Sequence, residues 1–211
     1  MKLKRQHYNN RGLGYADFFP QRHKKKIFEL ADLKPTDILY DLGCGDASIL
    51  IFAVKNFKIK KAIGFEDNST RNYIARINVK KARLSDRIII KNDDFEKIDV
   101  SEADVIFDML PEDRNDLKRY LNPKIKNGTR LIKHDLPLIG YLPDKVDIPF
   151  YRMRFPLKKA TNQKQWAKAV IGFSNAKIKD VWNDIYYYDK EKWYSKWDIY
   201  RYDKMLTERL R

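Results

Sequence analysis

Short segments with apolar residues at their centres recur along the chain at the spacing of buried strands. They span residues 38–42, 61–66, 87–91, 103–107 and 129–134. A helix is predicted over residues 21–31, where Ile27, Leu30 and Ala31 share one face, and a second helix is expected after its typical N-cap residue, Asn68. Alternating strands and helices of this length predict an α/β fold with a mainly parallel, doubly wound sheet.

A glycine-rich turn follows the first predicted strand. The run Tyr40-Asp41-Leu42-Gly43-Cys44-Gly45-Asp46-Ala47 leads into a helix-like stretch that starts at Ser48. A strand, a glycine turn and a helix hold nucleotide-type cofactors at the carboxyl edge of a parallel sheet. A Cβ at Gly43 or Gly45 would obstruct the turn and keep a ligand away from the backbone. The turn therefore predicts a small, flat cofactor.

The carboxylate of Asp46 indicates which cofactor this is. A dinucleotide fingerprint would have its third glycine at the position of Ser48, and it would place a pyrophosphate over the helix start beside Asp46. Asp46 would repel a phosphate. S-adenosylmethionine has no phosphate and carries a sulfonium and an ammonium cation, which carboxylates favour. The motif therefore predicts S-adenosylmethionine.

Acidic residues also follow the next two predicted strands. Glu66 lies 23 residues after Gly43, close to the spacing at which an acid holds the ribose hydroxyls in a strand-helix-strand unit. After the third strand, we expect Asp94 to accept a hydrogen bond from the adenine amine while Phe95 covers one face of the ring. The predicted cofactor-binding residues are Tyr40, Asp41, Gly43, Gly45, Asp46, Glu66, Asp67, Asp94, Phe95 and Asp108.

The stretch from about Pro20 to Pro143 resembles the class I, seven-strand methyltransferases. Within them it is most similar to the small archaeal protein lysine methyltransferases and their mitochondrial relatives. The segments that carry the resemblance are 40–46, 64–66, 94–95, 109–111 with Leu117, 121–123, 128–132 and 134–141. The resemblance implies a seven-strand Rossmann-like sheet, S-adenosylmethionine as cofactor and lysine side chains of proteins as methyl acceptors.

The acceptor side of such a site is expected in the loops after the fourth and fifth strands. Asp108 can orient an amine and Tyr141 can form a wall of its channel, and His134 completes the set of candidate catalytic residues. A helix is expected to begin at Pro111, so a role of Asp108 as its cap explains that residue equally well. No metal is predicted, because no metal-ligand spacing of histidine or cysteine surrounds His134 or Cys44.

The net charge of +15 is unevenly distributed. Residues 1–34 hold 9 basic and 3 acidic side chains, residues 35–150 hold 20 and 19, residues 151–179 hold 8 and 0, and residues 180–211 hold 7 and 7. Basic flanks of this kind attract polyanions such as nucleic acid, or else they form a solvated surface. Tyr151 and Phe155, interleaved with the arginines, favour a binding surface or a strand that turns one side inward.

The chain is expected to have three parts. Residues 1–34 form a basic N-terminal segment with the first helix, residues 35–179 form the methyltransferase domain, and residues 180–211 form an aromatic helical extension. This extension has three of the four tryptophans and six tyrosines, and it either packs on the core or docks a partner.

Cysteine content and hydropathy indicate a compartment. The single cysteine fits a reducing environment, and no apolar run approaches the ~20 residues of a membrane span. We therefore expect a cytoplasmic protein without a membrane partner.

Three functions are compatible with these patterns. The first is a protein lysine methyltransferase that acts by in-line displacement. The second is an RNA or DNA methyltransferase that uses residues 1–34 and 151–179 to bind nucleic acid. The third is a non-catalytic binding module that retains a cofactor fold.

Overall fold

The computed structural model describes the core of the chain. Described are residues 21–93, 98–108, 120, 124–134, 137–138, 140–147, 150–162, 165–166 and 169. The elements are α1 (Gln21–Ala31), β1 (Ile38–Leu42), α2 (Ser48–Phe57), β2 (Lys61–Phe65), α3 (Ser69–Lys81), β3 (Ile88–Lys91), β4 (Val105–Asp108), β5 (Arg130–His134), β6 (Lys145–Asp147) and β7 (Phe150–Arg154). Asp94 and Phe95, the helix expected from Pro111 and the aromatic extension 180–211 lie outside the described residues.

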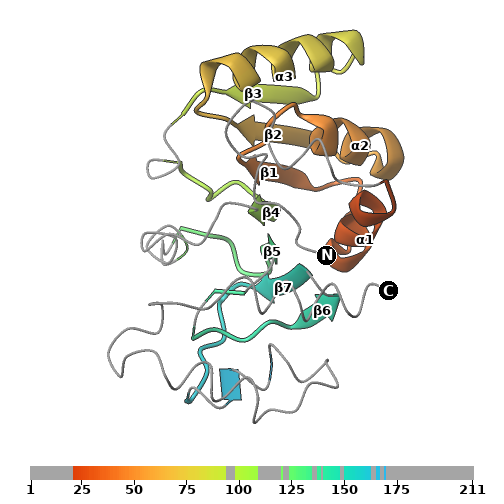
Figure 1. The fold of residues 1–211 in the computed structure, drawn as a ribbon. Coiled ribbons are helices and arrows are strands. Elements are labelled where there is room, and N and C mark those ends of the chain that lie inside the picture. Colours follow the sequence, from red (N-terminus) through yellow and green to blue (C-terminus); the bar gives the residue numbers. More distant parts are fainter. Residues whose placement is uncertain are drawn as a thin grey trace, which may run out of the picture.

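The strands form one seven-stranded sheet in the order β3-β2-β1-β4-β5-β7-β6. Neighbouring strands from β3 to β5 are parallel, and β7 runs antiparallel to both β5 and β6. Figure 1 shows this order from β3, beneath α3, down to β7 and β6. The predicted doubly wound, mainly parallel seven-strand sheet is confirmed.

Each face of the sheet has its own apolar cluster. On one face, Leu39, Val105 and Phe107 pack with apolar residues of α1, α2 and α3. On the other face, Tyr40 and Ile106 belong to a second cluster. Because both faces are covered, β1 and β4 are apolar at nearly every position, as is usual for parallel strands.

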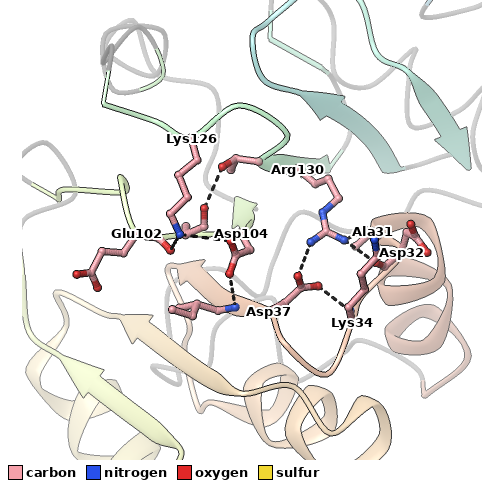
Figure 2. A network of polar contacts seen from close by, with 11 residues as sticks. Ala31, Asp32, Lys34, Asp37, Glu102, Asp104, Lys126 and Arg130 are labelled. Carbon is pink, nitrogen blue, oxygen red and sulfur yellow. Dashed lines mark hydrogen bonds and ion pairs between the residues drawn. The ribbon is translucent and has the colours of Figure 1, made fainter.

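A buried polar network joins the amino ends of the central strands (Figure 2). Arg130 Nη2 lies 2.7 Å from Asp37 Oδ1, and Arg130 Nη1 donates to the Ala31 carbonyl. Asp104 Oδ2 accepts a 2.9 Å hydrogen bond from Ile38 N. The network ties the end of α1 to β5 and β1 to the segment before β4. This network lies at the amino ends of the strands, opposite the carboxyl edge of the sheet where the glycine turn follows β1.

The first part of the basic segment 151–179 is a strand of the sheet. Arg152 is buried in β7, where its Nε and Nη2 make 2.9 and 2.7 Å contacts with the two carboxylate oxygens of Asp144. Arg154 Nε lies 3.3 Å from the same carboxylate. The inward-facing strand is therefore confirmed for this stretch, and Arg152 is not part of a binding surface. No helix in the described part of the chain has the length and apolar character needed to cross a membrane.

Candidate active site

The carboxyl ends of β1 and β4 meet at the centre of the sheet. From β1 the chain continues outward to β2 and β3, whereas β4 leads in the other direction to β5. In open α/β sheets, ligands bind in the crevice outside such a switch point. Leu42, the last residue of β1, is the register partner of Asp108, the last residue of β4. The topology therefore places Asp41, Asp108 and the glycine turn at one edge.

The glycine turn packs closely against the end of β2. Gly43 N and Cys44 N both donate to the Phe65 carbonyl at 2.9 Å, and Gly43 has a φ of 84°. A Cβ on Gly64 would lie 2.6 Å from Cys44 Sγ, so the strand needs glycine there. Cys44 is buried, and burial raises the pKa of its thiol. Its role is therefore packing rather than nucleophilic chemistry.

Glu66 supports the turn with its carboxylate. Its Oε2 accepts from Gly45 N at 2.9 Å and its Oε1 from Asn68 N at 3.1 Å. Burial raises the pKa of this carboxyl, although the two backbone N–H groups oppose the shift. A carboxylate has about four acceptor positions, so two further donors can bind. Glu66 can thus accept from a vicinal diol while it holds the loop.

Asp41 contributes a buried carboxylate oxygen to this edge. Among the described residues, its Oδ2 has no hydrogen-bond donor. Burial, as the largest cause, and the neighbouring Glu66, Asp108 and Asp46 carboxylates together raise the pKa of Asp41 to about 8. An orphaned carboxylate among other acids is the complement of a cationic ligand. The residues present therefore fit the sulfonium and ammonium groups of S-adenosylmethionine.

Asp108 takes part in a fully buried ion pair. Lys133 is its register partner on β5, and Lys133 Nζ lies 3.1 Å from Asp108 Oδ2, with both side chains inaccessible to solvent. The Tyr120 hydroxyl donates to the same oxygen. Two donors on one oxygen fix the plane of this carboxylate at the end of β4. Sequence reasoning missed Lys133 and Tyr120, although a lysine within an apolar strand was a signal for Lys133.

The remaining predicted residues occupy three kinds of position. Asp46 is half-buried and accepts a 2.9 Å hydrogen bond from the N–H of Ser48, the first residue of α2, while Asp67 is exposed beside Glu66. His134 is half-buried at the carboxyl end of β5, and Tyr141 is half-buried in the loop beyond it. The structure does not bring Tyr40 to the edge. Its ring is buried and packs against Phe65, with ring centroids 5.4 Å apart.

The fold, the glycine turn and the acidic edge define a class I methyltransferase that uses S-adenosylmethionine. Residues 41–145 match the family model of the ANTKMT methyltransferase domain. The chain is 38% identical over 128 residues to a protein-lysine N-methyltransferase of Saccharolobus islandicus, covering 60% of this chain and 80% of the relative. The chain belongs to this family of methyltransferases.

Two solved structures support the assignment. An RNA methyltransferase from Salinibacter ruber, in complex with S-adenosyl-L-homocysteine, is 31% identical, with a TM-score of 0.62. The match covers 68% of this chain and 97% of that protein. The C-terminal domain of precorrin-6Y C5,15-methyltransferase from Rhodobacter capsulatus has a TM-score of 0.50 at 14% identity, and its match covers 60% of this chain and 68% of that domain. The second likeness concerns the fold alone.

The raised pKa of Asp41 predicts a pH dependence of stability. A carboxyl whose pKa is higher in the folded state stabilises the fold at low pH and loses that contribution as pH rises toward about 8. The free energy of unfolding of Asp41→Asn, relative to the unmodified protein, should therefore increase from acid to alkaline pH in the absence of cofactor. Urea unfolding at several pH values measures it. A difference that is independent of pH would contradict the role assigned to Asp41.

Proposed function

We propose that the chain is a protein lysine methyltransferase. The observation that carries the proposal is the match to the protein-lysine N-methyltransferase, which extends over most of that relative's length. The carboxylates of Asp46 and Glu66 at this edge agree with it, because carboxylates attract a cationic side chain. This local acidity offsets the repulsion that a chain of net charge +15 exerts on lysine-rich segments.

The cofactor side of the proposed site consists of the glycine turn and the acids around it. When bound, S-adenosylmethionine supplies an electrophilic methyl group on a sulfonium. We assign the ribose hydroxyls to Glu66, with Asp67 beside it, and the cationic groups to Asp41. Gly43 and Gly45 leave room for the ligand against the backbone, while Asp46 holds the start of α2 in place.

The acceptor side is assigned to Asp108, His134 and Tyr141. The acceptor nitrogen uses its lone pair to bond the methyl carbon while the carbon–sulfur bond breaks, and the amine must therefore reach the site without its proton. Burial in an apolar channel favours the neutral amine. Asp108, whose carboxylate plane is fixed by Lys133 and Tyr120, can orient that amine in line with the methyl group.

Methyl transfer into a desalted cell extract tests the proposal. With methyl-labelled S-adenosylmethionine, we expect the label to survive nuclease treatment, to be lost with protease treatment and to appear as methyllysine after acid hydrolysis. The Glu66→Ala variant serves as the control for background labelling. Label that survives protease and is lost with nuclease would overturn the proposal.

RNA is the second candidate acceptor. It is favoured by the likeness to the Salinibacter ruber protein, whose structure is described as an RNA methyltransferase. The same extract experiment distinguishes the two, since RNA methylation gives methylated nucleosides on complete digestion. No label in either fraction would favour a binding module without catalytic activity.

A further inference from the structure

Asn72 joins the ends of two parallel strands beside the acidic edge. It lies in the first part of α3 and is only 5% exposed. Its Nδ2 donates to the carbonyl of Glu66, the residue after β2, at 3.1 Å, and to the carbonyl of Lys91, the last residue of β3, at 3.0 Å. Nδ2 carries two hydrogens, so each carbonyl receives one. Asn72 thus fixes two strand ends at the carboxyl edge of the sheet.

The remaining polar atom of this amide is also bound. Asn72 Oδ1 accepts a 2.8 Å hydrogen bond from Arg76 Nε, one turn further along α3. This contact determines the orientation of the amide, since its NH₂ group must then face the two carbonyls. Ala75 and Val79 pack the same helix on the sheet with apolar side chains. Asn72 is therefore distinguished from these neighbours by directional hydrogen bonds.

The main chain of Glu66 is held on both sides. Its N–H donates to the Lys91 carbonyl at 3.1 Å, and its own carbonyl accepts from Asn72. The Glu66 carboxylate in turn accepts from Gly45 N and Asn68 N. Asn72 fixes the backbone from which this carboxylate extends, so it helps to determine where the carboxylate lies relative to the glycine turn.

Asn78 makes the corresponding contact with the glycine turn. Its Nδ2 donates to the Asp46 carbonyl at 3.0 Å. That carbonyl belongs to the peptide bond before Ala47, whose φ of 64° lies in the left-handed region, which is unfavourable for a residue with a Cβ. The hydrogen bond from Asn78 holds this peptide plane, and it therefore helps to keep the end of the turn in its conformation.

We propose that Asn72 and Asn78 are positioning residues for S-adenosylmethionine. One helix holds both parts of the cofactor side of the site, the Glu66 end through Asn72 and the glycine turn through Asn78. The inference rests on the role that the proposed function assigns to Glu66. Groups that are already in place bind a ligand more tightly, because binding does not have to order them. Loss of either amide should therefore weaken cofactor binding, although neither amide is assigned a contact with the cofactor.

Asn72→Leu and Asn78→Leu test the proposal, with Thr129→Val as the matched control. Each substitution keeps the approximate shape of the side chain and removes a donor to a backbone carbonyl. Thr129 is buried and its Oγ1 donates to the Ala103 carbonyl at 2.9 Å, but at the amino ends of the strands. In calorimetric titrations with S-adenosylmethionine, we expect the two asparagine variants to bind about threefold to tenfold more weakly and Thr129→Val to stay within about twofold.

The melting temperature distinguishes positioning from support of the fold. All three variants leave a carbonyl without its donor, so all three should melt below the unmodified protein. A merely structural role would lower the melting temperatures of Asn72→Leu and Asn78→Leu while their cofactor affinities stayed as close to the unmodified value as that of Thr129→Val. This result would overturn the proposal.

A surface variant provides a test that does not disturb the buried amide directly. Arg76 is exposed, and Arg76→Met removes the hydrogen bond that orients Asn72. Arg83→Met removes the same charge from an exposed position just beyond α3 and is the control. We expect Arg76→Met to bind the cofactor about threefold more weakly than Arg83→Met. If Asn72→Leu does not fold, equal affinities of these two variants would reject the role of Asn72.

A double variant separates this inference from the assignment of Glu66. If Asn72 acts through Glu66, Asn72→Leu should cost less than about twofold further in a Glu66→Ala background, titrated at correspondingly higher concentrations. An equal loss in both backgrounds would contradict the inference for Asn72. Unchanged affinity in Glu66→Ala itself would overturn the assignment of Glu66, whereas weak binding by Glu66→Ala with normal binding by both asparagine variants would overturn this inference alone.

Discussion

Glu66→Ala should lose S-adenosylmethionine binding by about two orders of magnitude or more, because hydrogen bonds to a charged group contribute about 1.5–3 kcal/mol each. The proposed role gives Glu66 two such bonds, one to each ribose hydroxyl. The carboxylate also holds Gly45 N and Asn68 N, so the empty loop loses two backbone contacts in addition. Calorimetric titration with S-adenosylmethionine measures the effect.

Two control variants separate binding from folding. Asp67→Ala removes the exposed neighbouring carboxylate and should leave the affinity within about threefold of the unmodified protein. Glu66→Gln keeps the shape but removes the charge, so its affinity should lie between those of Glu66→Ala and the unmodified protein. A folded Glu66→Ala variant that binds the cofactor with unchanged affinity would rule out this assignment.

The parallel part of the sheet could be predicted from the sequence because burial on both faces leaves a continuous apolar run. The strands predicted at 38–42 and 103–107 are apolar at all but one position, and the first helix, 21–31, was predicted from its apolar face. Asn68 caps α3 as its residue type suggests, accepting a 3.0 Å hydrogen bond from Arg71 N. These features are local, so neighbouring residues are enough to determine them.

Features that depend on pairing across the chain were harder to predict. Arg152 seemed to belong to a basic flank, but it is buried because Asp144 binds its guanidinium and the Leu30 carbonyl accepts from Nη1 at 3.2 Å. Tyr40 was predicted to bind cofactor because it belongs to the glycine-turn motif. Its position on β1 instead points its side chain into the core. The position of Glu66, directly after β2, was easier to predict, because it depends only on a fixed spacing from the glycine turn.

The partner of Asp108 likewise depends on register. Residue types alone left open whether Asp108 caps a helix or orients an amine, and Lys133 was not considered. Only the direct pairing of β4 with β5 brings the two side chains together. The helix expected from Pro111 lies outside the described residues, so the capping alternative stays a prediction.

Lys133→Met should lower the free energy of unfolding by about 3–5 kcal/mol, because it leaves the Asp108 carboxylate buried without its cation. Lys126→Met, which breaks the more exposed pair with Asp104, is the control and should cost about 0–1 kcal/mol. Urea unfolding measures both. A loss below about 1 kcal/mol in Lys133→Met would show that the buried pair does not hold Asp108 in place.

The double variant Asp108→Asn/Lys133→Met separates support of the fold from chemistry. Replacing both charges removes the unpaired buried ion, so most of the stability lost in Lys133→Met should return. Methyl transfer should not return, since the carboxylate proposed to orient the amine is gone, and kcat should fall while S-adenosylmethionine affinity changes little. If the double variant recovered activity together with stability, Asp108 and Lys133 would be structural, and the acceptor site would have to be formed by other residues of the same edge, with His134 and Tyr141 the next to replace.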